Sequence, residues 1–257
     1  MIDIHCHILP GIDDGSRTIE ESIDIIKKAI DNGVTDIIVT PHYMLGTDYI
    51  LNNNGKKKVL ERLKKYIKVN NLDINVYLGN EVFVENNMPI LHKEEEITTL
   101  NDSKYLLFGL PMNYKFNGLN DVIFNLGCKG YKPVIAHPER YSFIKENPSL
   151  AIDLIDKGVL FQSNIGSFLG AYGKKAKETA ITLLKHGAIS FIASDIHHNT
   201  HDFYDRIEEC KEIMHKYIQA EEIDDLFINN PKKILNNDII NTPKCTPIKK
   251  SIFGKWK

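Results

Sequence analysis

The sequence of 257 residues has a formal net charge of -2, with 42% hydrophobic and 26% charged residues. These are the proportions of a globular protein, and they exclude a mainly disordered chain and a nucleic-acid binder with a large basic excess. No apolar run approaches the roughly 18 to 20 residues of a membrane span, and the N-terminus lacks signal-peptide features, so we expect a cytoplasmic protein that is not itself transmembrane. The four cysteines form no CxxC pair and are predicted to be reduced thiols.

Short β-branched or apolar runs alternate with longer segments of helical period, which is the pattern of βα units around a parallel sheet. The first predicted helix has clear end signals, because Thr18 and Glu21 have capping-box spacing and Gly33 is placed to end it. The predicted strands cover residues 2–5, 35–40, 74–78, 105–110, 133–137, 159–164 and 189–195. The predicted helices cover residues 19–30, 56–69, 118–129, 149–157, 174–186 and 203–220.

No internal repeat, low-complexity tract or flexible linker divides the chain, so we expect one α/β domain over residues 1–238. Strand number and length favour a barrel-like closure over two separate sheets. Residues 239–257 form a lysine-rich tail, with five lysines and no acidic residue from Asn241 onward. We expect this tail to be poorly ordered and solvated, with contact to an acidic partner or a membrane surface as the alternative.

Polar residues gather where the predicted strands end. In parallel βα architectures these ends converge on one face, so their side chains are candidates for a single shared site. The candidates are His5, His7, Asp14, His42, Glu81, His137, Asp195 and His197.

The spacing of these residues points to metal binding. His5 and His7 are two apart on a predicted strand, so both side chains project to one side and can bind one ion together. One such pair is a weak signal, but Asp195 and His197 repeat it, and several histidines and carboxylates occupy the other strand ends. This mixture suits Mn²⁺, Fe or Zn²⁺ better than Mg²⁺ or Ca²⁺. So many candidate ligands predict two or three ions and a metallohydrolase that acts on a phosphate ester.

The motifs HxH, DDG, PH, GNE, AHPER and SDxH occur in this order, and the order resembles the PHP (polymerase and histidinol phosphatase) superfamily. The opening MIDIHCHILPGIDDGSRTIEES is very similar to its bacterial branch of manganese-dependent protein-tyrosine phosphatases, which regulate capsule and exopolysaccharide synthesis. The resemblance extends from Met1 to about Asp238. It implies a distorted seven-stranded βα barrel, typically three metal ions held by all eight candidates, and phosphotyrosines in the tail of a membrane-associated tyrosine autokinase as substrate.

One position departs from the pattern of that branch. Its fourth strand usually ends with a metal-bridging glutamate, whereas this chain has Gly109 in the sequence YLLFGLP, with no carboxylate next to it. The departure predicts reduced metal occupancy and turnover, unless a water or a shifted Glu81 fills the gap. Two alternatives to an active tyrosine phosphatase therefore stay open. They are a small-molecule phosphoesterase of the histidinol-phosphatase type and a weakly active or inactive phosphotyrosine-binding regulator.

The expected reaction is in-line attack of a metal-bound hydroxide on phosphorus, without a covalent phosphoenzyme. Arg140 is the first candidate to bind the phosphate oxygens and Arg206 the second. His42 or His197 could assist the leaving phenolate if it is not fully committed to metal. The cysteine-based mechanism is excluded, because no cysteine is followed six positions later by an arginine. Three aromatic residues could flank the phenyl ring, with core packing as the alternative for each: Tyr43, Tyr141 and Phe168.

Overall fold

The computed structural model describes residues 1–250 and 256. Its described strands are β1 (Ile2–Cys6), β2 (Asp36–Val39), β3 (His42–Tyr43), β4 (Asn75–Leu78), β5 (Glu81–Phe83), β6 (Tyr105–Gly109), β7 (Lys132–Ala136), β8 (Leu160–Asn164) and β9 (Phe191–Ala193). They form two parallel sheets, in the orders β1-β2-β4 and β3-β5-β6-β7-β8-β9. The predicted α/β class with parallel strands is confirmed.

All seven predicted strands are present, and two short strands were not predicted. β3 and β5 follow β2 and β4 after interruptions of two residues, at Thr40-Pro41 and Gly79-Asn80. Pro41 has no N–H for a ladder hydrogen bond, which suits a break between strands. β3 and β5 pair in parallel with His42 opposite Glu81, so the interruptions bring two predicted ligands side by side.

The helices follow most strands, as the βα pattern predicts. They are α1 (Ile19–Asp31), α2 (Asn53–Val69), α3 (Met88–Lys93), α4 (Leu119–Cys128), α5 (Ser142–Glu146), α6 (Ser149–Ile155), α7 (Ile165–Leu169), α8 (Lys174–Lys185), α9 (Ile207–Met214), α10 (Ala220–Asp224) and α11 (Asn230–Leu235), with short 3-10 turns η1 (Leu100–Asp102) and η2 (Pro138–Arg140) and a π turn η3 (Asp225–Asn229). The predicted helix over 203–220 was too long: α9 covers only Ile207–Met214, and a separate helix, α10, starts after the capping box of Gln219 and Glu222. In the part of the chain that the structure describes, no helix has the length and apolar character needed to cross a membrane.

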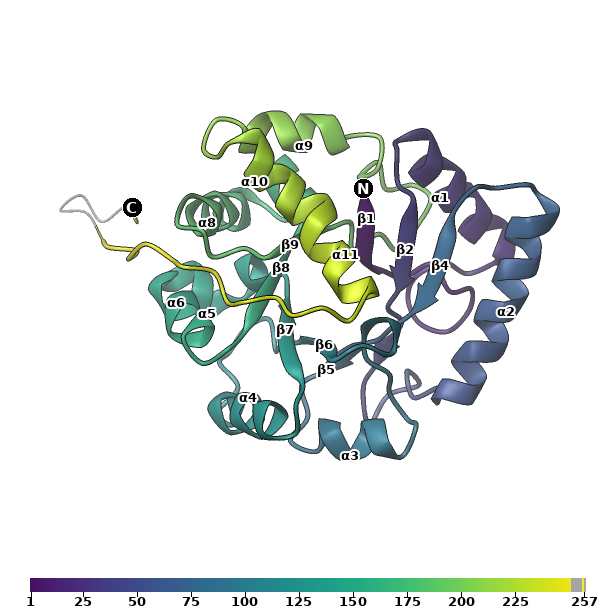
Figure 1. The fold of residues 1–257 in the computed structure, drawn as a ribbon, viewed down its shortest axis with the longest axis horizontal. Coiled ribbons are helices and arrows are strands. Elements are labelled where there is room, and N and C mark those ends of the chain that lie inside the picture. The colour runs from purple at the N-terminus through teal and green to yellow at the C-terminus, as the bar shows by residue number, and fades with distance from the viewer. Residues whose placement is uncertain (251–255, 257) are drawn as a thin grey trace.

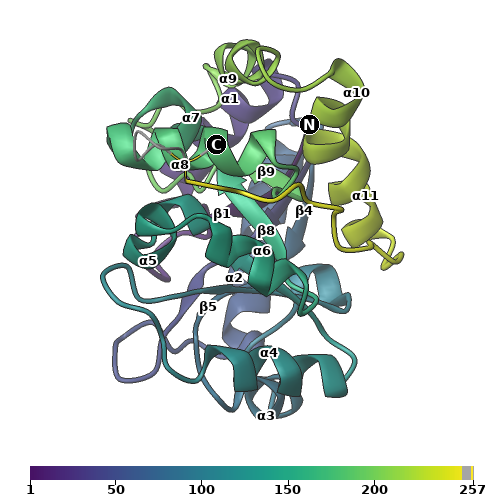
Figure 2. The same cartoon turned by 90° about the vertical axis from the view of Figure 1, so that its left-hand side faces the viewer.

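The helices surround the strands, as the two perpendicular views show (Figures 1 and 2). α10, α11 and the yellow tail cross the face on which the N-terminus lies (Figure 1). Alternate strand residues pack outward against the helices and inward against one another, which gives two buried apolar clusters. The opposite face, at the carboxyl ends of the strands, is left for the site.

The described part of the tail contacts the body of the protein. The Tyr105 hydroxyl donates to the Asp238 carbonyl at 2.6 Å and accepts from the Ile240 amide at 2.8 Å. Ile240 and Ile248 are buried, and the Thr246 amide donates to the carbonyl of His186. The sequence predicted poor order for the whole tail, residues 239–257. Residues 251–255 and 257 of it lie outside the described residues.

Candidate metal centre

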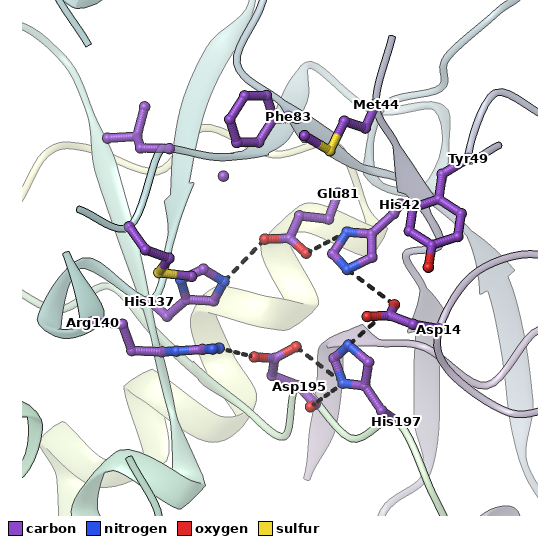
Figure 3. Close-up of a pocket in the computed structure, with 13 residues that line it drawn as sticks. Asp14, His42, Met44, Tyr49, Glu81, Phe83, His137, Arg140, Asp195 and His197 are labelled. Atoms are coloured by element: carbon purple, nitrogen blue, oxygen red, sulfur yellow. Dashed lines mark hydrogen bonds and ion pairs between the residues drawn. The ribbon is translucent and has the colours of Figure 1, made fainter. Parts of the chain in front are cut away.

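Six of the eight predicted ligands line a cavity of about 330 Å³ at the carboxyl ends of the strands (Figure 3). His5 and His7 are completely buried there. The cavity is lined by Asp14, His42, Met44, Tyr49, Glu81, Phe83, Gly109, Leu110, Met112, His137, Arg140, Asp195 and His197.

Four buried side chains form what we call the inner group: His5, His7, Glu81 and Asp195. His5 Nε2 lies 3.3 Å from Glu81 Oε2 and 3.4 Å from Asp195 Oδ1. His7 Nε2 lies 3.5 and 3.4 Å from the same two oxygens. Ligands about 2.1 Å from one ion lie roughly 3 to 3.5 Å from each other, so these four atoms are spaced as the ligands of one metal.

Buried hydrogen bonds orient the two histidines of the inner group. His5 Nδ1 lies 2.7 Å from Gln162 Oε1, and the Gln162 amide nitrogen donates to Asn164, so the amide oxygen is free to accept from His5. His7 Nδ1 donates to Asp13 Oδ2 at 2.8 Å. Both rings therefore present Nε2 toward the carboxylates. Such partners fix the tautomer and direction of metal-binding imidazoles.

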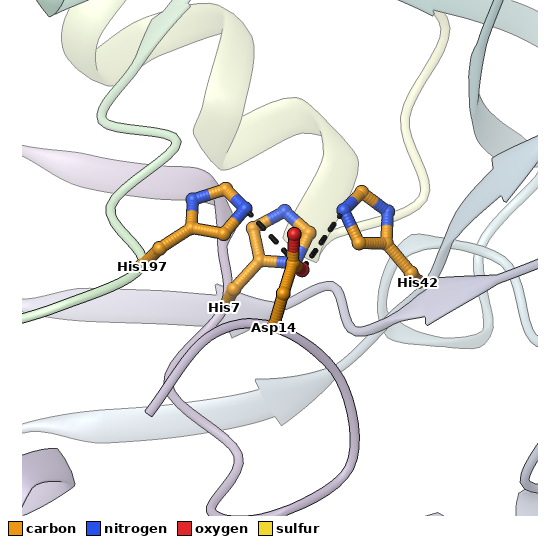
Figure 4. Close-up of side chains that lie close together, drawn as sticks. All are labelled: His7, Asp14, His42 and His197. Carbon is orange, nitrogen blue, oxygen red and sulfur yellow. Dashed lines mark ion pairs between the residues drawn. The ribbon is translucent and has the colours of Figure 1, made fainter. Parts of the chain in front are cut away.

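A second set shares His7 and is nearer to solvent; we call His7, Asp14, His42 and His197 the outer group (Figure 4). Asp14 Oδ1 lies 3.4 Å from His42 Nε2 and 3.7 Å from His197 Nε2. The rings of His7 and His197 stack at 4.0 Å between centroids. The side chains of Asp14, His42 and His197 are 54%, 28% and 20% exposed, so this group lies at the mouth of the cavity.

His137 and Glu81 each have a buried atom that could bind a metal ion. His137 Nε2 lies 3.0 Å from Glu81 Oε1, but within the described chain Glu81 Oε2 and His137 Nδ1 have no hydrogen-bond partner. Buried polar atoms are normally paired, because desolvation without a partner costs free energy. Together with the spacing of both groups, these unpaired atoms indicate that the residues fit divalent metal ions.

The site histidines keep the carboxylates ionised. Burial alone would raise the pKa of Glu81, but the attraction of His5 and His42 and the hydrogen bond from His137 hold it well below its usual value. Burial likewise opposes ionisation of Asp195, and His5 and His7 lower its pKa well below normal. Ionised carboxylates are the form that binds a cation, so the charge pattern also fits metal binding.

Two predicted ligands have strained backbones. His137 and Asp195 lie in the left-handed region, with φ of 35° and 51°. Non-glycine residues rarely adopt this conformation, and it is often found at functional sites. His137 lies between the end of β7 and the 3-10 turn η2, and Asp195 lies two residues beyond the end of β9.

The structure brings one of the two predicted arginines to the cavity. Arg140 Nη1 donates to Asp195 Oδ2 at 2.8 Å, and its guanidinium lies 4.2 Å from the ring centre of Tyr172. Arg206 does not line the cavity; its guanidinium instead pairs with the neighbouring Glu209 through bonds of 2.8 and 3.0 Å.

The family model for capsular polysaccharide synthesis proteins, CpsB/CapC, matches residues 1–236. The chain belongs to this family. It is 33% identical over 256 residues to the tyrosine-protein phosphatase YwqE of Bacillus subtilis, with 99% of each chain covered. It is 29% identical over 248 residues to the tyrosine-protein phosphatase CpsB of Streptococcus pneumoniae, covering 93% of this chain and all of the relative. The predicted resemblance is confirmed.

Solved structures give the same relationship. A chain from the crystal structures of YwqE and of CpsB from Streptococcus pneumoniae, described as unique metal-dependent tyrosine phosphatases, matches with a TM-score of 0.89 and 31% identity. The match covers 97% of this chain and 100% of that one. An amidohydrolase from Mycoplasma synoviae matches with a TM-score of 0.61 at 15% identity, which supports the fold alone.

The sequence did not single out the residues that orient the ligands or those that form the apolar wall. Asp13 was visible beside Asp14, but Gln162 and Asn164 are uncharged residues in a strand and gave no signal. The three aromatic candidates for the phenyl ring are buried and do not line the cavity, in line with the alternative of core packing: Tyr43, Tyr141 and Phe168. The cavity wall is formed instead by Met44, Tyr49, Phe83, Leu110 and Met112.

Proposed function

We propose that this protein is a metal-dependent protein-tyrosine phosphatase that acts in capsular or exopolysaccharide synthesis. The observation that carries the proposal is the position of two metal-binding groups at the base and mouth of one apolar-walled cavity. The names of the curated relatives support the same activity. The proposed substrate is phosphotyrosine in the tail of a membrane-associated tyrosine autokinase, on the cytoplasmic side of the membrane.

We assign the inner and outer groups, together with His137, to two or three Mn²⁺ ions, with Fe or Zn²⁺ as other metals that suit the ligands. When bound, such ions supply positive charge that neutralises a phosphate ester and activates water. The protein's contribution is to hold the imidazoles and carboxylates in fixed directions. Gln162 and Asp13 do this for the inner histidines.

Arg140 is proposed to bind a phosphate oxygen. Its side chain is 25% exposed at the cavity wall, and Asp195 and the face of Tyr172 hold the guanidinium in one place. The N–H groups not used by Asp195 are free to donate to an entering phosphate. His42, at the mouth, is assigned to the outer group, so its direct help to the leaving phenolate would require that it not be bound to an ion; the phenolate needs little acid catalysis because its pKa is about 10.

The apolar wall favours an aryl phosphate over a polar small molecule. Tyr49, Phe83 and Met112 line the cavity beside the ligands, so a phenyl ring would bury apolar surface there. Leu45, Ile50 and Tyr114 are exposed apolar or aromatic side chains that lie within two residues in sequence of the lining residues Met44, Tyr49 and Met112. This arrangement supports a phosphotyrosine in a polypeptide more than histidinol phosphate.

The test is turnover with added Mn²⁺ on a phosphotyrosine peptide, the matching phosphoserine peptide and histidinol phosphate. We expect clear preference for the phosphotyrosine peptide, and Tyr49→Ala should raise its KM several-fold. Tyr66→Ala, which changes an exposed tyrosine of α2, is the matched control and should behave as the wild type. No turnover of any phosphotyrosine substrate by metal-loaded protein, or preference for histidinol phosphate, would refute the proposal.

We also propose that the two sheets close into one distorted seven-stranded barrel. A parallel bridge joins Cys6, at the end of β1, to Ile196, just beyond β9. The amides of His7 and Asp195 donate across this junction to Ile196 and His5. If β3 and β5 are counted as continuations of β2 and β4, seven strands surround the core.

A further inference from the structure

The lysine-rich tail is held along the body of the protein with its apolar side chains inward. Ile240 and Ile248 are buried. Between them, the Thr246 amide donates to the carbonyl of His186 at 3.1 Å, and the Thr246 hydroxyl lies 2.8 Å from His186 Nδ1. In both views the tail passes between α6 and α8 (Figures 1 and 2). These contacts leave the lysines of the described tail exposed on the outside: Lys244, Lys249 and Lys250.

The end of the tail lies at a cavity of about 620 Å³ whose wall is basic and aromatic. Lys250 Nζ lies 5.5 Å from the ring centre of Trp256, and Lys185 Nζ lies 5.5 Å from that of Tyr217. In the described part of the chain, no lysine of this wall forms an ion pair with a carboxylate. The charged lining residues are four lysines and two acids: Lys145, Lys175, Lys185, Lys250, Glu146 and Glu178.

Charge and aromatic content together favour an anionic lipid surface over an acidic protein as the partner. From Asn241 onward the tail has five lysines, no arginine and no acid, and without these five charges the net charge of -2 would be -7. Protein interfaces are enriched in arginine and depleted of lysine, whereas an anionic bilayer attracts flexible lysines without requiring a fixed geometry. Tryptophan and tyrosine are favoured at the headgroup level of membranes, because their rings are apolar with one polar end.

We propose that the tail lysines and the cavity wall around Trp256 dock on an anionic lipid surface. The lysines are attracted to the negative headgroups, and the Trp256 ring enters the headgroup region. Binding of this kind is peripheral and reversible, because a few lysines and one ring hold a protein far less tightly than a membrane-spanning helix does. The inference uses neither the metal centre nor the phosphotyrosine substrate, so it goes beyond the proposed function.

The first test is co-sedimentation of the full chain with phosphatidylcholine vesicles that contain or lack phosphatidylserine. We expect binding only to the vesicles with phosphatidylserine. Binding should fall steeply between about 0.1 and 1 M salt, because the Debye length decreases from about 10 to about 3 Å.

A charge variant and a matched control show whether the tail is responsible. The tail variant should bind these vesicles at least about tenfold more weakly, and it carries Lys244→Gln, Lys249→Gln and Lys250→Gln. The control should bind as the wild type. It makes the same change of charge at exposed lysines of α2, on the opposite side of Figure 1 from α8: Lys57→Gln, Lys58→Gln and Lys65→Gln.

The second test uses the fluorescence of Trp256, which is the only tryptophan in the sequence. We expect its emission to shift to shorter wavelength when vesicles with phosphatidylserine are added, and to be quenched by lipids with brominated acyl chains. Vesicles of phosphatidylcholine alone should cause neither change. Trp256→Ala should weaken vesicle binding several-fold.

The outcomes separate the inference from the proposed function. Absence of phosphatidylserine-dependent binding, equal weakening in the tail variant and its control, or an unchanged Trp256 emission would each overturn the inference. Binding to a polyglutamate peptide but not to vesicles would assign the surface to an acidic protein instead. Turnover of a soluble phosphotyrosine peptide should be the same in the tail variant and the wild type, because these lysines do not line the metal cavity. Loss of that turnover in the wild type would refute the proposed function and leave the lipid result unaffected.

Discussion

The inner and outer groups share His7 and differ in how the protein supports them. The inner side chains are buried, and His5 is oriented by Gln162 through a bond inside the protein. In the outer group, His197 Nδ1 lies 2.9 Å from the carbonyl of Asp195, but Asp14 is more than half exposed. Rigid, dry ligands bind an ion with less reorganisation than mobile, hydrated ones. We therefore expect the inner ion to exchange slowly and the outer ion to exchange readily and face the substrate.

Asp13→Asn should have the largest effect, because Asp13 supports the residue common to both groups. Its Oδ2 accepts from His7 Nδ1 at 2.8 Å and from the His42 amide at 2.9 Å. Burial alone would raise the pKa of Asp13, but His7 and His42 hold it below its usual value, so the ionised form is the one that supports them. We expect Mn²⁺ affinity or turnover to fall by about 10 to 100-fold.

Mn²⁺ titration and kcat on a phosphotyrosine peptide measure this effect. Asp48→Asn, which removes an exposed acid from the loop after β3, is the control with the same chemical change and should leave both values unchanged. Loss of only the outer ion in Asp13→Asn would mean that the two groups are not coupled through His7.

Asp14→Asn should have a smaller effect that is confined to the outer group. Asp14 lies with His7, His42 and His197 in the outer group and does not belong to the set formed by His5, Glu81 and Asp195. We expect metal content to fall by about one ion per chain while the buried inner ion stays bound through dialysis. Turnover should fall and partly recover at high Mn²⁺. If Asp14→Asn loses every ion, the distinction between a permanent inner ion and an exchangeable outer one is wrong.

The convergence of the candidate ligands could be predicted from the sequence because their positions follow from local rules. Alternation puts His5 and His7 on one side of a strand, and parallel topology gathers the strand ends. Neither rule needs the details of packing, so the residue types at those ends already predicted a metal site.

The supporting residues depend on long-range packing and gave no such signal. Gln162 is far in sequence from its partner His5, and Asn164 is far from its partner Asp195, so these pairs meet only when the strands have assembled. The sequence ranked Arg140 above Arg206, and the fold agrees, because Arg140 lines the cavity whereas Arg206 pairs with Glu209. Glu81 and Gly109 lie on different strands, and their close approach could be found only from the coordinates.

The smallest predicted effect concerns the corner at Gly79-Asn80, between β4 and β5, directly before Glu81 of the inner group. Lys56 of α2 is fully buried, and its Nζ donates to Asn80 Oδ1 at 2.7 Å and to the Glu96 carbonyl at 2.9 Å. The Asn80 amide in turn donates to the carbonyl of Pro41, which joins the interruptions after β2 and β4. Among the described residues, Lys56 is the only buried lysine or arginine, and the outer group has no such support. Lys56 therefore tests whether the inner group is also stabilised by residues that do not contact the candidate ligands.

Burial lowers the pKa of Lys56 to about 7, with Glu96 opposing the shift. Between pH 7 and the ordinary lysine pKa of about 10.4, the unfolded chain binds this proton and the folded protein does not, so Lys56 makes the free energy of unfolding rise with pH. Lys56→Met removes this contribution, and Lys57→Met, which changes an exposed neighbour, should keep it. Urea unfolding of the metal-free proteins should give a slope between pH 7 and 9 that is flatter by about 1 kcal/mol per pH unit in Lys56→Met. Equal slopes in both variants would mean that Lys56 keeps its proton in the fold, and that the corner under Glu81 is held by an ammonium ion.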